Sequence, residues 1–267
     1  MAAPVLRIER LSMEFPARGT APPTHALEGV SATVERGEFV ALLGPSGCGK
    51  STLLNLVAGF LRPSAGTILH EGRPVTRPDH RRTVVFQDYA LFPWMSLRRN
   101  VEFGLKARGM PARERAALAG EWLARVRLRG FEERYPHEVS GGMKQRAAIA
   151  RALAPEPSLV LMDEPFGALD AQTRVLLQEE VARIAAGAER TVLFVTHGIE
   201  EAVFLADRIL VMSARPGRVR AEYPVPFPRP RLPAMRRDRA FVALVQDLWE
   251  ALKPEWQEGV RDDDQAA

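Results

Sequence analysis

The nine residues GPSGCGKST, from Gly44 to Thr52, constrain the fold of this chain more than any other segment. They match the pattern G-x-x-x-x-G-K-[S/T] and lie between the apolar run EFVALLG and the helically spaced segment KSTLLNLVAGF. In a strand–loop–helix context, glycines let backbone N–H groups turn toward phosphate oxygens, and the helix start adds a favourable dipole. The segment therefore predicts a phosphate-binding loop within an α/β fold.

Every residue of this loop is a predicted nucleotide contact. Lys50 is expected to reach the β- and γ-phosphates, and Ser51 to coordinate Mg²⁺. Cys48 has no apparent base beside it, so we expect a thiol near the phosphates that is open to alkylation rather than catalytic. The predicted set is Gly44, Pro45, Ser46, Gly47, Cys48, Gly49, Lys50, Ser51 and Thr52.

Strand-like and helical segments alternate along the second half of the chain. Apolar runs at 158–165, 191–197 and 208–212 predict strands, and the segments 171–188 and 199–207 predict helices between them. Alternation of this kind predicts an α/β fold with a parallel sheet.

Other segments depart from this alternation. Residues 5–11 predict a short N-terminal strand, and residues 16–25 a loop rich in proline and glycine. From about 93 to 153 the chain is mostly helical in character, so we expect an inserted helical lobe. The tail holds a Pro-rich stretch at 223–233, and a helix is expected near 235–252.

Composition excludes some classes of protein. The 267 residues carry a net charge of +4 with scattered arginines, which favours a solvated basic surface over a membrane-binding or acid-binding face. A single cysteine excludes a disulfide framework and a cysteine-based zinc site. We expect neither a signal peptide nor a membrane span.

Two acidic residues lie at the end of the strand predicted at 158–165. Asp163 is suited to hold Mg²⁺ and Glu164 to polarise a water molecule, although an ordinary strand-ending turn is the alternative. His197 lies at the end of the strand predicted at 191–197. A structural histidine is the alternative there, but the carboxyl ends of parallel strands converge on the ligand site, which would bring His197 near the γ-phosphate.

Six segments resemble the motifs of the ATP-binding subunits of ABC transporters. They occur along the chain in the order typical of that family, and together they span most of residues 1–213. The phosphate loop resembles Walker A, and LVLMDEP resembles Walker B. VVFQDYALFPW resembles the Q-loop with Gln87, VSGGMKQR the signature, GALD the D-loop with Asp170, and VTHGIEEA the H-loop with His197.

The resemblance implies a P-loop NTPase core, a mixed sheet with flanking helices, together with an N-terminal antiparallel β part and an inserted helical subdomain. It implies a single ABC ATPase domain over 1–267. The core would occupy 1–92 and 156–213, the helical signature subdomain 93–155, and a short C-terminal tail with a helix 214–267.

The resemblance also implies roles for single residues. Phe15 would stack on adenine, with a core phenylalanine as the alternative. Ser51, Gln87 and Asp163 would hold Mg²⁺. Glu164 would be the general base, Gln87 would sense the metal and the attacking water, and His197 would contact the γ-phosphate.

In this family, two subunits sandwich two ATP molecules, and the signature of one contacts the nucleotide held by the other. The residues that would act in this way are Ser140, Gly141, Gly142 and Met143. The glycines and the helix start would offer backbone N–H groups as a second anion cradle. The usual signature is Leu-Ser-Gly-Gly-Gln, and Met143 cannot hydrogen-bond as glutamine would.

Finer features resemble the importer subfamily that serves nitrate, sulfonates, taurine and related solutes. They are VVFQDYALFPWMSLRRNVEFGL, DEPFGALDAQTR and SARPGRV. Leu91, Phe92, Pro93 and Trp94 would form part of a groove that receives a helix of the permease, with ordinary packing between the lobes as the alternative.

The implied activity is hydrolysis of ATP with Mg²⁺, coupled to transport at the cytoplasmic face of the membrane. The implied partners are a second copy on ATP binding, an integral-membrane permease and, indirectly, a periplasmic or lipoprotein solute-binding protein. Sulfonate or taurine is the first substrate expected, then nitrate and pyrimidine-type solutes. An exporter ATPase is one alternative. A soluble ABC ATPase acting on nucleic acid is another, but the chain lacks the long heptad segment that this class carries, so no nucleic acid is expected.

Overall fold

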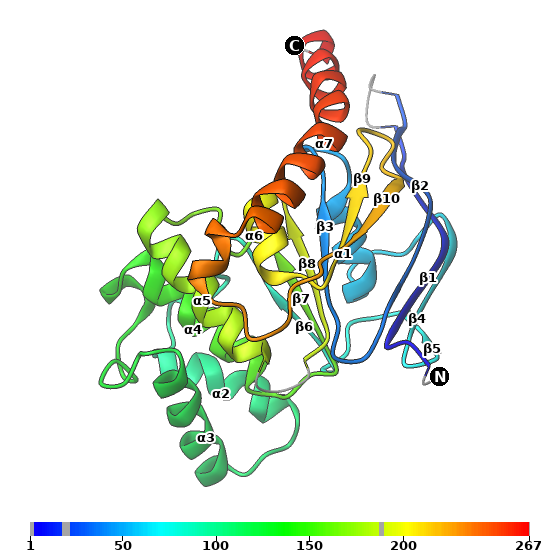
Figure 1. Cartoon of the computed structure of the whole chain (residues 1–267). Coiled ribbons are helices and arrows are strands. Elements are labelled where there is room, and N and C mark those ends of the chain that lie inside the picture. The colour runs from blue at the N-terminus through cyan, green and yellow to red at the C-terminus, as the bar shows by residue number, and fades with distance from the viewer. Residues whose placement is uncertain (1–2, 18–21, 187–189, 267) are drawn as a thin grey trace. The chain divides into compact units, whose positions relative to one another are not determined.

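The computed structural model describes residues 3–17, 22–186 and 190–266 (Figure 1). They divide into two compact units, the first made of Met1–Pro78 and Ala182–Ala267, the second of Asp79–Val181. The helical subdomain expected at 93–155 remains a prediction.

An antiparallel sheet forms the N-terminal part of the first unit, with strand order β2-β1-β4-β5. Its strands are β1 (Leu6–Phe15), β2 (Thr24–Val34), β4 (Ala65–His70) and β5 (Arg73–Pro74). Buried Leu6 and Ile8 alternate with the exposed Arg7 on β1, as expected for a strand with one covered face. The predicted loop at 16–25 overlaps the start of β2 by two residues, and residues 18–21 lie outside the described residues.

A second, mixed sheet in the first unit has the order β10-β9-β3-β8. Its strands are β3 (Phe39–Leu43), β8 (Val192–Thr196), β9 (Arg208–Met212) and β10 (Val219–Pro224). β3 is parallel to both β8 and β9, whereas β10 pairs antiparallel with β9. Every residue of β3 and β8 is buried, which explains why both strands read as unbroken apolar runs.

Three helices belong to this unit: α1 (Lys50–Ala58), α6 (Ile199–Leu205) and α7 (Arg239–Ala266). α7 packs against α6 (Figure 1). Phe241 and Leu248 of α7 are buried. The predicted bounds of the last helix, near 235 and 252, are both wrong. Pro233–Arg237 forms a 3-10 turn, α7 begins two residues later, and it extends to Ala266.

The Pro-rich stretch before α7 is anchored by a buried arginine. Arg231 donates to the carbonyls of Ala206 and Phe204 at the end of α6 and forms an ion pair with Asp207. Arg229 binds the same carboxylate. Desolvation lowers the pKa of Arg231 to about 10, although the Asp207 charge opposes this shift.

The second unit contains the parallel strand pair β6 (Arg82–Val85) and β7 (Leu159–Asp163) and a group of helices. The helices are α2 (Leu97–Ala107), α3 (Ala112–Arg125), the 3-10 turn η1 (Pro136–Glu138) and α4 (Gly141–Leu153). Val101, Leu105 and Trp122 form part of their buried core. α5 (Ala171–Ala186) extends across the division at Val181, and residues 187 and 188 of the predicted helix lie outside the described residues.

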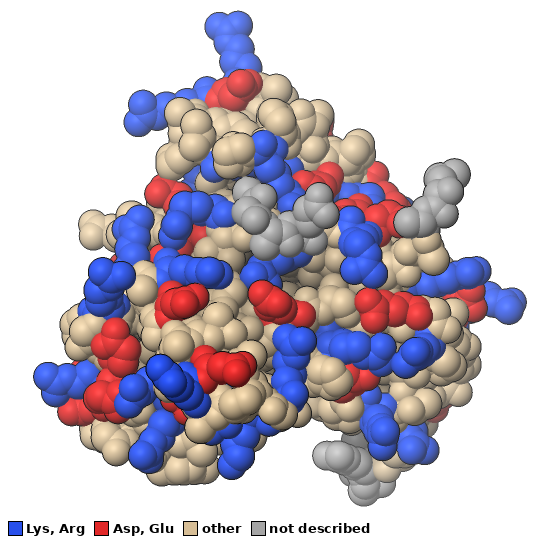
Figure 2. Space-filling view, turned by 90° about the horizontal axis from the view of Figure 1, so that it is seen from below, with Lys and Arg blue, Asp and Glu red and all other residues tan. Residues whose placement is uncertain are grey.

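The predicted α/β fold is confirmed, with its mixed sheet, its antiparallel N-terminal part and its helical segment. Acidic and basic side chains are interspersed over the face seen in Figure 2. Within the described ranges, no helix is both long enough and apolar enough to cross a membrane.

Candidate functional site

The phosphate loop joins β3 to α1 and wraps around the ammonium group of Lys50. The Lys50 Nζ atom donates to the carbonyls of Gly44 at 2.9 Å and Pro45 at 2.7 Å, and the side chain is only 4% exposed. The loop therefore holds a positive charge beside the N-terminus of a nine-residue helix. Both the ammonium and the helix start favour an anion.

Two glycines of the loop have left-handed backbone conformations, Gly47 with φ +75° and Gly49 with φ +96°. A Cβ atom on Gly49 would also lie 2.7 Å from the carbonyl oxygen of Ala26. A larger residue at either position would be strained, and at Gly49 it would push the loop away from β2.

Cys48 does not behave as the sequence predicted. The side chain is 1% exposed, and its Sγ atom lies 3.8 Å from the Lys50 Nζ atom. Burial raises the pKa of the thiol, although the nearby Lys50 charge opposes the shift. A buried, protonated thiol reacts slowly, so the expectation of a thiol open to alkylation is wrong.

Phe15 and His197 are the other predicted site residues in the first unit. Phe15 ends β1, pairs with Thr24 and is half-buried, so it is not a fully enclosed core side chain. His197 follows β8 and is exposed. The turn that carries it is fixed by Thr196, whose hydroxyl donates to the carboxylate of Glu201 and accepts from the N–H of Gly198 at 2.8 Å.

The second unit brings the side chains of Gln87 and Glu164 together. A Cβ atom on Gly167 would lie 3.3 Å from Gln87 Nε2 and 3.7 Å from a carboxylate oxygen of Glu164. Gln87 follows β6 and Asp163 ends β7, so the parallel pairing of these strands explains the proximity. Glu164 has φ +42°, a strained conformation for a residue with a side chain. Strain of this kind, roughly 1–3 kcal/mol, is commonly found at functional sites.

The signature residues form the N-terminus of α4. The Ser140 hydroxyl accepts a hydrogen bond from the Met143 N–H at 3.4 Å and so caps the helix. A Cβ atom on Gly141 would lie 3.0 Å from the Tyr89 hydroxyl, and one on Gly142 would lie 2.6 Å from the Thr173 methyl group. The neighbouring side chains Tyr89 and Thr173 therefore leave little room for a side chain at Gly141 or Gly142.

Asp170 caps the start of α5 next to this signature. Its carboxylate accepts from the Thr173 N–H at 3.0 Å. Hydrogen bonds from the Thr173 backbone and hydroxyl lower the pKa of Asp170, so the residue is a carboxylate at neutral pH. The methyl group of Thr173 thus contacts the signature, and its N–H and hydroxyl groups donate to Asp170.

The segment Leu91–Trp94 is held in one conformation while its aromatic rings stay accessible. The amide of Asn100 accepts from Phe92 N–H at 2.8 Å and donates to the carbonyls of Phe92 and Met95. The ring of Phe92 packs against Trp94 and Phe103, with centroids 5.6 and 4.7 Å apart. Trp94 is 68% exposed and Pro93 is also exposed, whereas Leu91 is half-buried.

Sequence reasoning missed Arg151, which connects α4 to the segment after Gln87. Its guanidinium donates to the carbonyls of Ala90 at 2.6 Å and Tyr89 at 3.1 Å, two residues with left-handed backbones. Desolvation lowers the pKa of Arg151. No local sequence signal could have identified this contact, because a helical arginine gives no indication of carbonyl partners more than sixty residues away.

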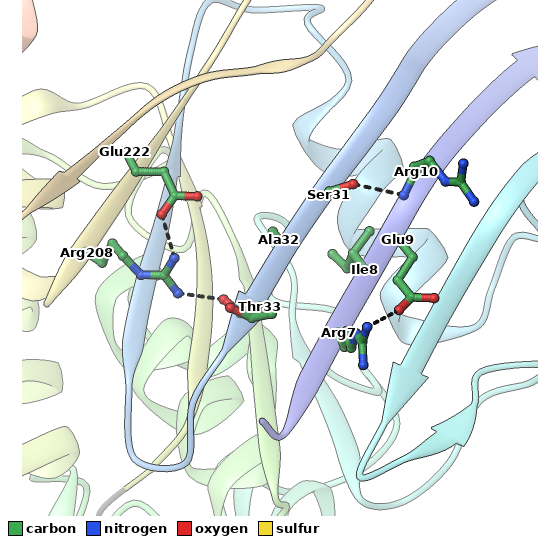
Figure 3. Close-up of a pocket in the computed structure, with 9 residues that line it drawn as sticks. All are labelled: Arg7, Ile8, Glu9, Arg10, Ser31, Ala32, Thr33, Arg208 and Glu222. Atoms are coloured by element: carbon green, nitrogen blue, oxygen red, sulfur yellow. Dashed lines mark hydrogen bonds and ion pairs between the residues drawn. The ribbon is translucent and has the colours of Figure 1, made fainter. Parts of the chain in front are cut away.

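Figure 3 shows an open pocket of about 590 Å³ on the first unit, at β1, β2, β9 and β10. Arg208 donates there to Glu222 and to the carbonyl of Thr33, and Arg7 pairs with Glu9. The residues that line this pocket include none of the predicted site residues. Its acidic and basic groups largely neutralise one another, so it is not the predicted phosphate site.

The donor groups fit a nucleotide with Mg²⁺ better than a metal held by protein alone. Among the described residues, no group of three or more His, Cys, Asp or Glu side chains could hold a metal ion. Mg²⁺ is usually bound by one or two carboxylates together with phosphate oxygens and water. The Ser51 hydroxyl and the Asp163 carboxylate are ligands of this type.

Comparisons with known proteins agree on one family. A family model described as ABC transporter matches residues 27–167. A taurine import ATP-binding protein of Chromobacterium violaceum is 48% identical over 248 residues, which cover 91% of this chain and 94% of that protein. A nitrate import ATP-binding protein of a Synechocystis species is 51% identical over 203 residues, or 76% of each chain.

The solved structures lead to the same family. A dimeric ATP-binding cassette in a post-hydrolysis state, bound to ADP and phosphate, matches with a TM-score of 0.73 at 30% identity. The match covers 83% of this chain and 99% of that one.

Proposed function

The chain belongs to the ABC transporter family, and from that premise we propose that it is the ATP-hydrolysing subunit of an importer for a small solute. The similarity to taurine and nitrate import proteins over most of the chain is the observation that carries the proposal. Sulfonates such as taurine come first among the proposed substrates, and nitrate second.

Nucleotide binding rests on the phosphate loop. Lys50 would give its ammonium to the β- and γ-phosphates in exchange for the carbonyls of Gly44 and Pro45 that it now contacts. The backbone N–H groups of Gly47 to Thr52 would supply further hydrogen bonds at the start of α1. Phe15, half-buried at the end of β1, would offer its ring to the adenine.

Hydrolysis rests on residues that follow three strands. Glu164 would accept a proton from the attacking water, and Gln87, whose amide lies beside the same glycine as the Glu164 carboxylate, would orient that water. His197 would donate a hydrogen bond to the γ-phosphate. Ser51, Gln87 and Asp163 would hold Mg²⁺, which supplies charge neutralisation of the phosphates when bound.

The signature would act on the nucleotide of a second copy of the chain. The dimeric state of the similar cassette supports this arrangement. Ser140 has a hydroxyl hydrogen left to donate, because its oxygen is the acceptor for the Met143 N–H. Gly141 and Gly142 lie in the first turn of α4, where N–H groups have no partner within the helix. Asp170 would contact the partner copy next to this cradle.

Leu91–Trp94 would contact the permease at the cytoplasmic face of the membrane. Exposed Trp94, with Phe92 and Phe103 beside it, is the kind of aromatic patch that anchors protein interfaces. The hydrogen bonds of Asn100 fix its backbone in advance, which lowers the ordering cost of docking. A solute-binding protein would take part indirectly through the permease.

Affinity capture from gently solubilised native membranes tests this function. The tagged chain should retain one integral-membrane permease, identified by mass spectrometry. A solute-binding protein that copurifies with the permease can then be screened for binding of sulfonates, nitrate and pyrimidines. Trp94→Ala should lose the permease while still binding ATP. Trp249→Ala is the matched control, because it removes another exposed tryptophan. Capture of nucleic acid or ribosomes without a permease would overturn the transport function.

A further inference from the structure

The turn between β9 and β10, Ser213–Arg218, packs against the phosphate loop. A Cβ atom on Gly217 would lie 2.0 Å from the carbonyl oxygen of Cys48, so only glycine permits this close approach. The guanidinium of Arg215 donates to the carbonyl of Gly47, with its Nε and Nη2 atoms at 3.4 and 3.2 Å. The turn therefore contacts two consecutive peptide groups of the loop.

These contacts determine which way the loop N–H groups point. In a trans peptide the C=O and the following N–H point in opposite directions. A Gly47 carbonyl held by Arg215 directs the Cys48 N–H away from the turn, and a Cys48 carbonyl against Gly217 does the same for the Gly49 N–H. The phosphate cradle needs such aligned N–H groups.

The C-terminal helix binds the same turn through a buried carboxylate. Glu255 on α7 is 4% exposed, and its Oε2 atom accepts from the N–H of Ala214 at 2.7 Å. Its Oε1 atom accepts from Arg220 on β10 at 2.9 Å. Both carboxylate oxygens are thus paired, and charge-assisted hydrogen bonds of this kind are short and strong. Leu252, about one turn earlier on α7, is fully buried.

We propose that the C-terminal helix α7 controls nucleotide affinity by supporting the phosphate loop through the Ser213–Arg218 turn. Glu255 is the positioning residue that holds the turn, and Arg215 and Gly217 are the points at which the turn touches the loop. The inference rests on the proposed role of this loop in binding ATP. It extends that role to a segment that shares no motif with the nucleotide site.

The test compares two arginines of one turn in the full chain. Arg215→Ala removes the contact with Gly47. Arg218→Ala, the matched control, removes the same charge from an exposed residue that pairs with Glu28. Loss of one hydrogen bond predicts ATP affinity about fivefold weaker for Arg215→Ala. The kcat should change less than about twofold, because a ground-state contact is removed. Arg218→Ala should match the wild type, and Arg215→Lys should recover part of the affinity.

Glu255→Gln tests the role of the helix. It should weaken ATP binding to a similar degree, and the double variant with Arg215→Ala should be no weaker than the single variants, because both act on one support. If Glu255→Gln does not fold, Glu255→Asp replaces it, since it retracts the carboxylate from Ala214 but keeps the charge. Additive losses would overturn the proposed link between α7 and the loop.

Hydrogen exchange of residues 44–50 in the nucleotide-free chain gives a second readout. Arg215→Ala and the Glu255 variant should both speed exchange there, whereas Arg218→Ala should not. If Arg215→Ala and Arg218→Ala bind ATP and exchange alike, the inference is overturned while the nucleotide site stands. If the wild-type chain fails to bind ATP, the proposed function falls and the inference falls with it.

Discussion

Gly142→Ala provides a quantitative test of the contact between the signature and the D-loop. The new methyl carbon would lie 2.6 Å from the Thr173 methyl carbon, about 1 Å closer than carbon atoms normally pack. Overpacking of this kind costs about 1–3 kcal/mol. Alanine in a helix regains about 0.5–1 kcal/mol relative to glycine. The expected net destabilisation is therefore about 0–2.5 kcal/mol, with a midpoint slightly above 1 kcal/mol.

Thr173 cannot relieve the overlap at no cost. Rotation about its χ1 angle would move the methyl group but would also remove the hydroxyl from the Asp170 carboxylate. Either outcome disturbs a contact that connects the signature to the D-loop, so ATP hydrolysis should fall together with stability.

A double-mutant cycle with Thr173→Ser isolates the contact. Serine keeps the hydroxyl and lacks the methyl group, so Gly142→Ala should be neutral or slightly stabilising in that background, with a coupling of about 1–3 kcal/mol. Thermal unfolding would show Gly142→Ala lowering Tm by about 2–6 °C in the otherwise wild-type chain only. Gly120→Ala is the control, because nothing lies within 4 Å of its Cβ position in helix α3. Equal effects of Gly142→Ala in both backgrounds would refute the reasoning.

Three further predictions concern the proposed catalytic groups. Lys50→Ala should weaken ATP binding by at least about tenfold, measured by nucleotide fluorescence, because the loop loses its only cation; unchanged affinity would exclude the proposed role. Glu164→Gln should lower the steady-state rate of phosphate release by about a hundredfold or more but retain ATP binding, and a rate near that of the wild type would remove Glu164 as the base. Alkylation of Cys48 by iodoacetamide should be at least about tenfold slower in the folded chain than in urea, as peptide mass would show, and equal rates would contradict its burial.

The sequence predicts the α/β fold well because its strands and loops are local signals. The buried β3 and β8 read as apolar runs, and the glycines of the phosphate loop indicate left-handed turns within a few residues. The start of helix α7 is harder to predict from the sequence. Arg236 and Arg237 continue a helical pattern, but a 3-10 turn precedes the true start at Arg239.

The contacts that the sequence could not predict all join distant residues. Arg151 binds carbonyls at Tyr89 and Ala90, and Glu255 binds the N–H of Ala214. An arginine or glutamate on a helix usually faces solvent, so nothing in its local pattern indicates a buried partner. The sequence also does not indicate that Cys48 is buried, because the burial of a side chain depends on how its loop packs in the fold.

In the proposed mechanism, a second copy of the chain completes the nucleotide site. ATP binding and ATP hydrolysis by a Ser140→Arg variant test it most directly, because the arginine alters the signature and leaves Lys50 and the phosphate loop of the same chain intact. Loss of the Ser140 cap would cost about 1 kcal/mol of stability. Retained ATP binding would show that the variant is still folded. We expect the variant to bind ATP with an affinity within about twofold of the wild type and to have lost ATP hydrolysis. Hydrolysis at the wild-type rate would contradict the shared site.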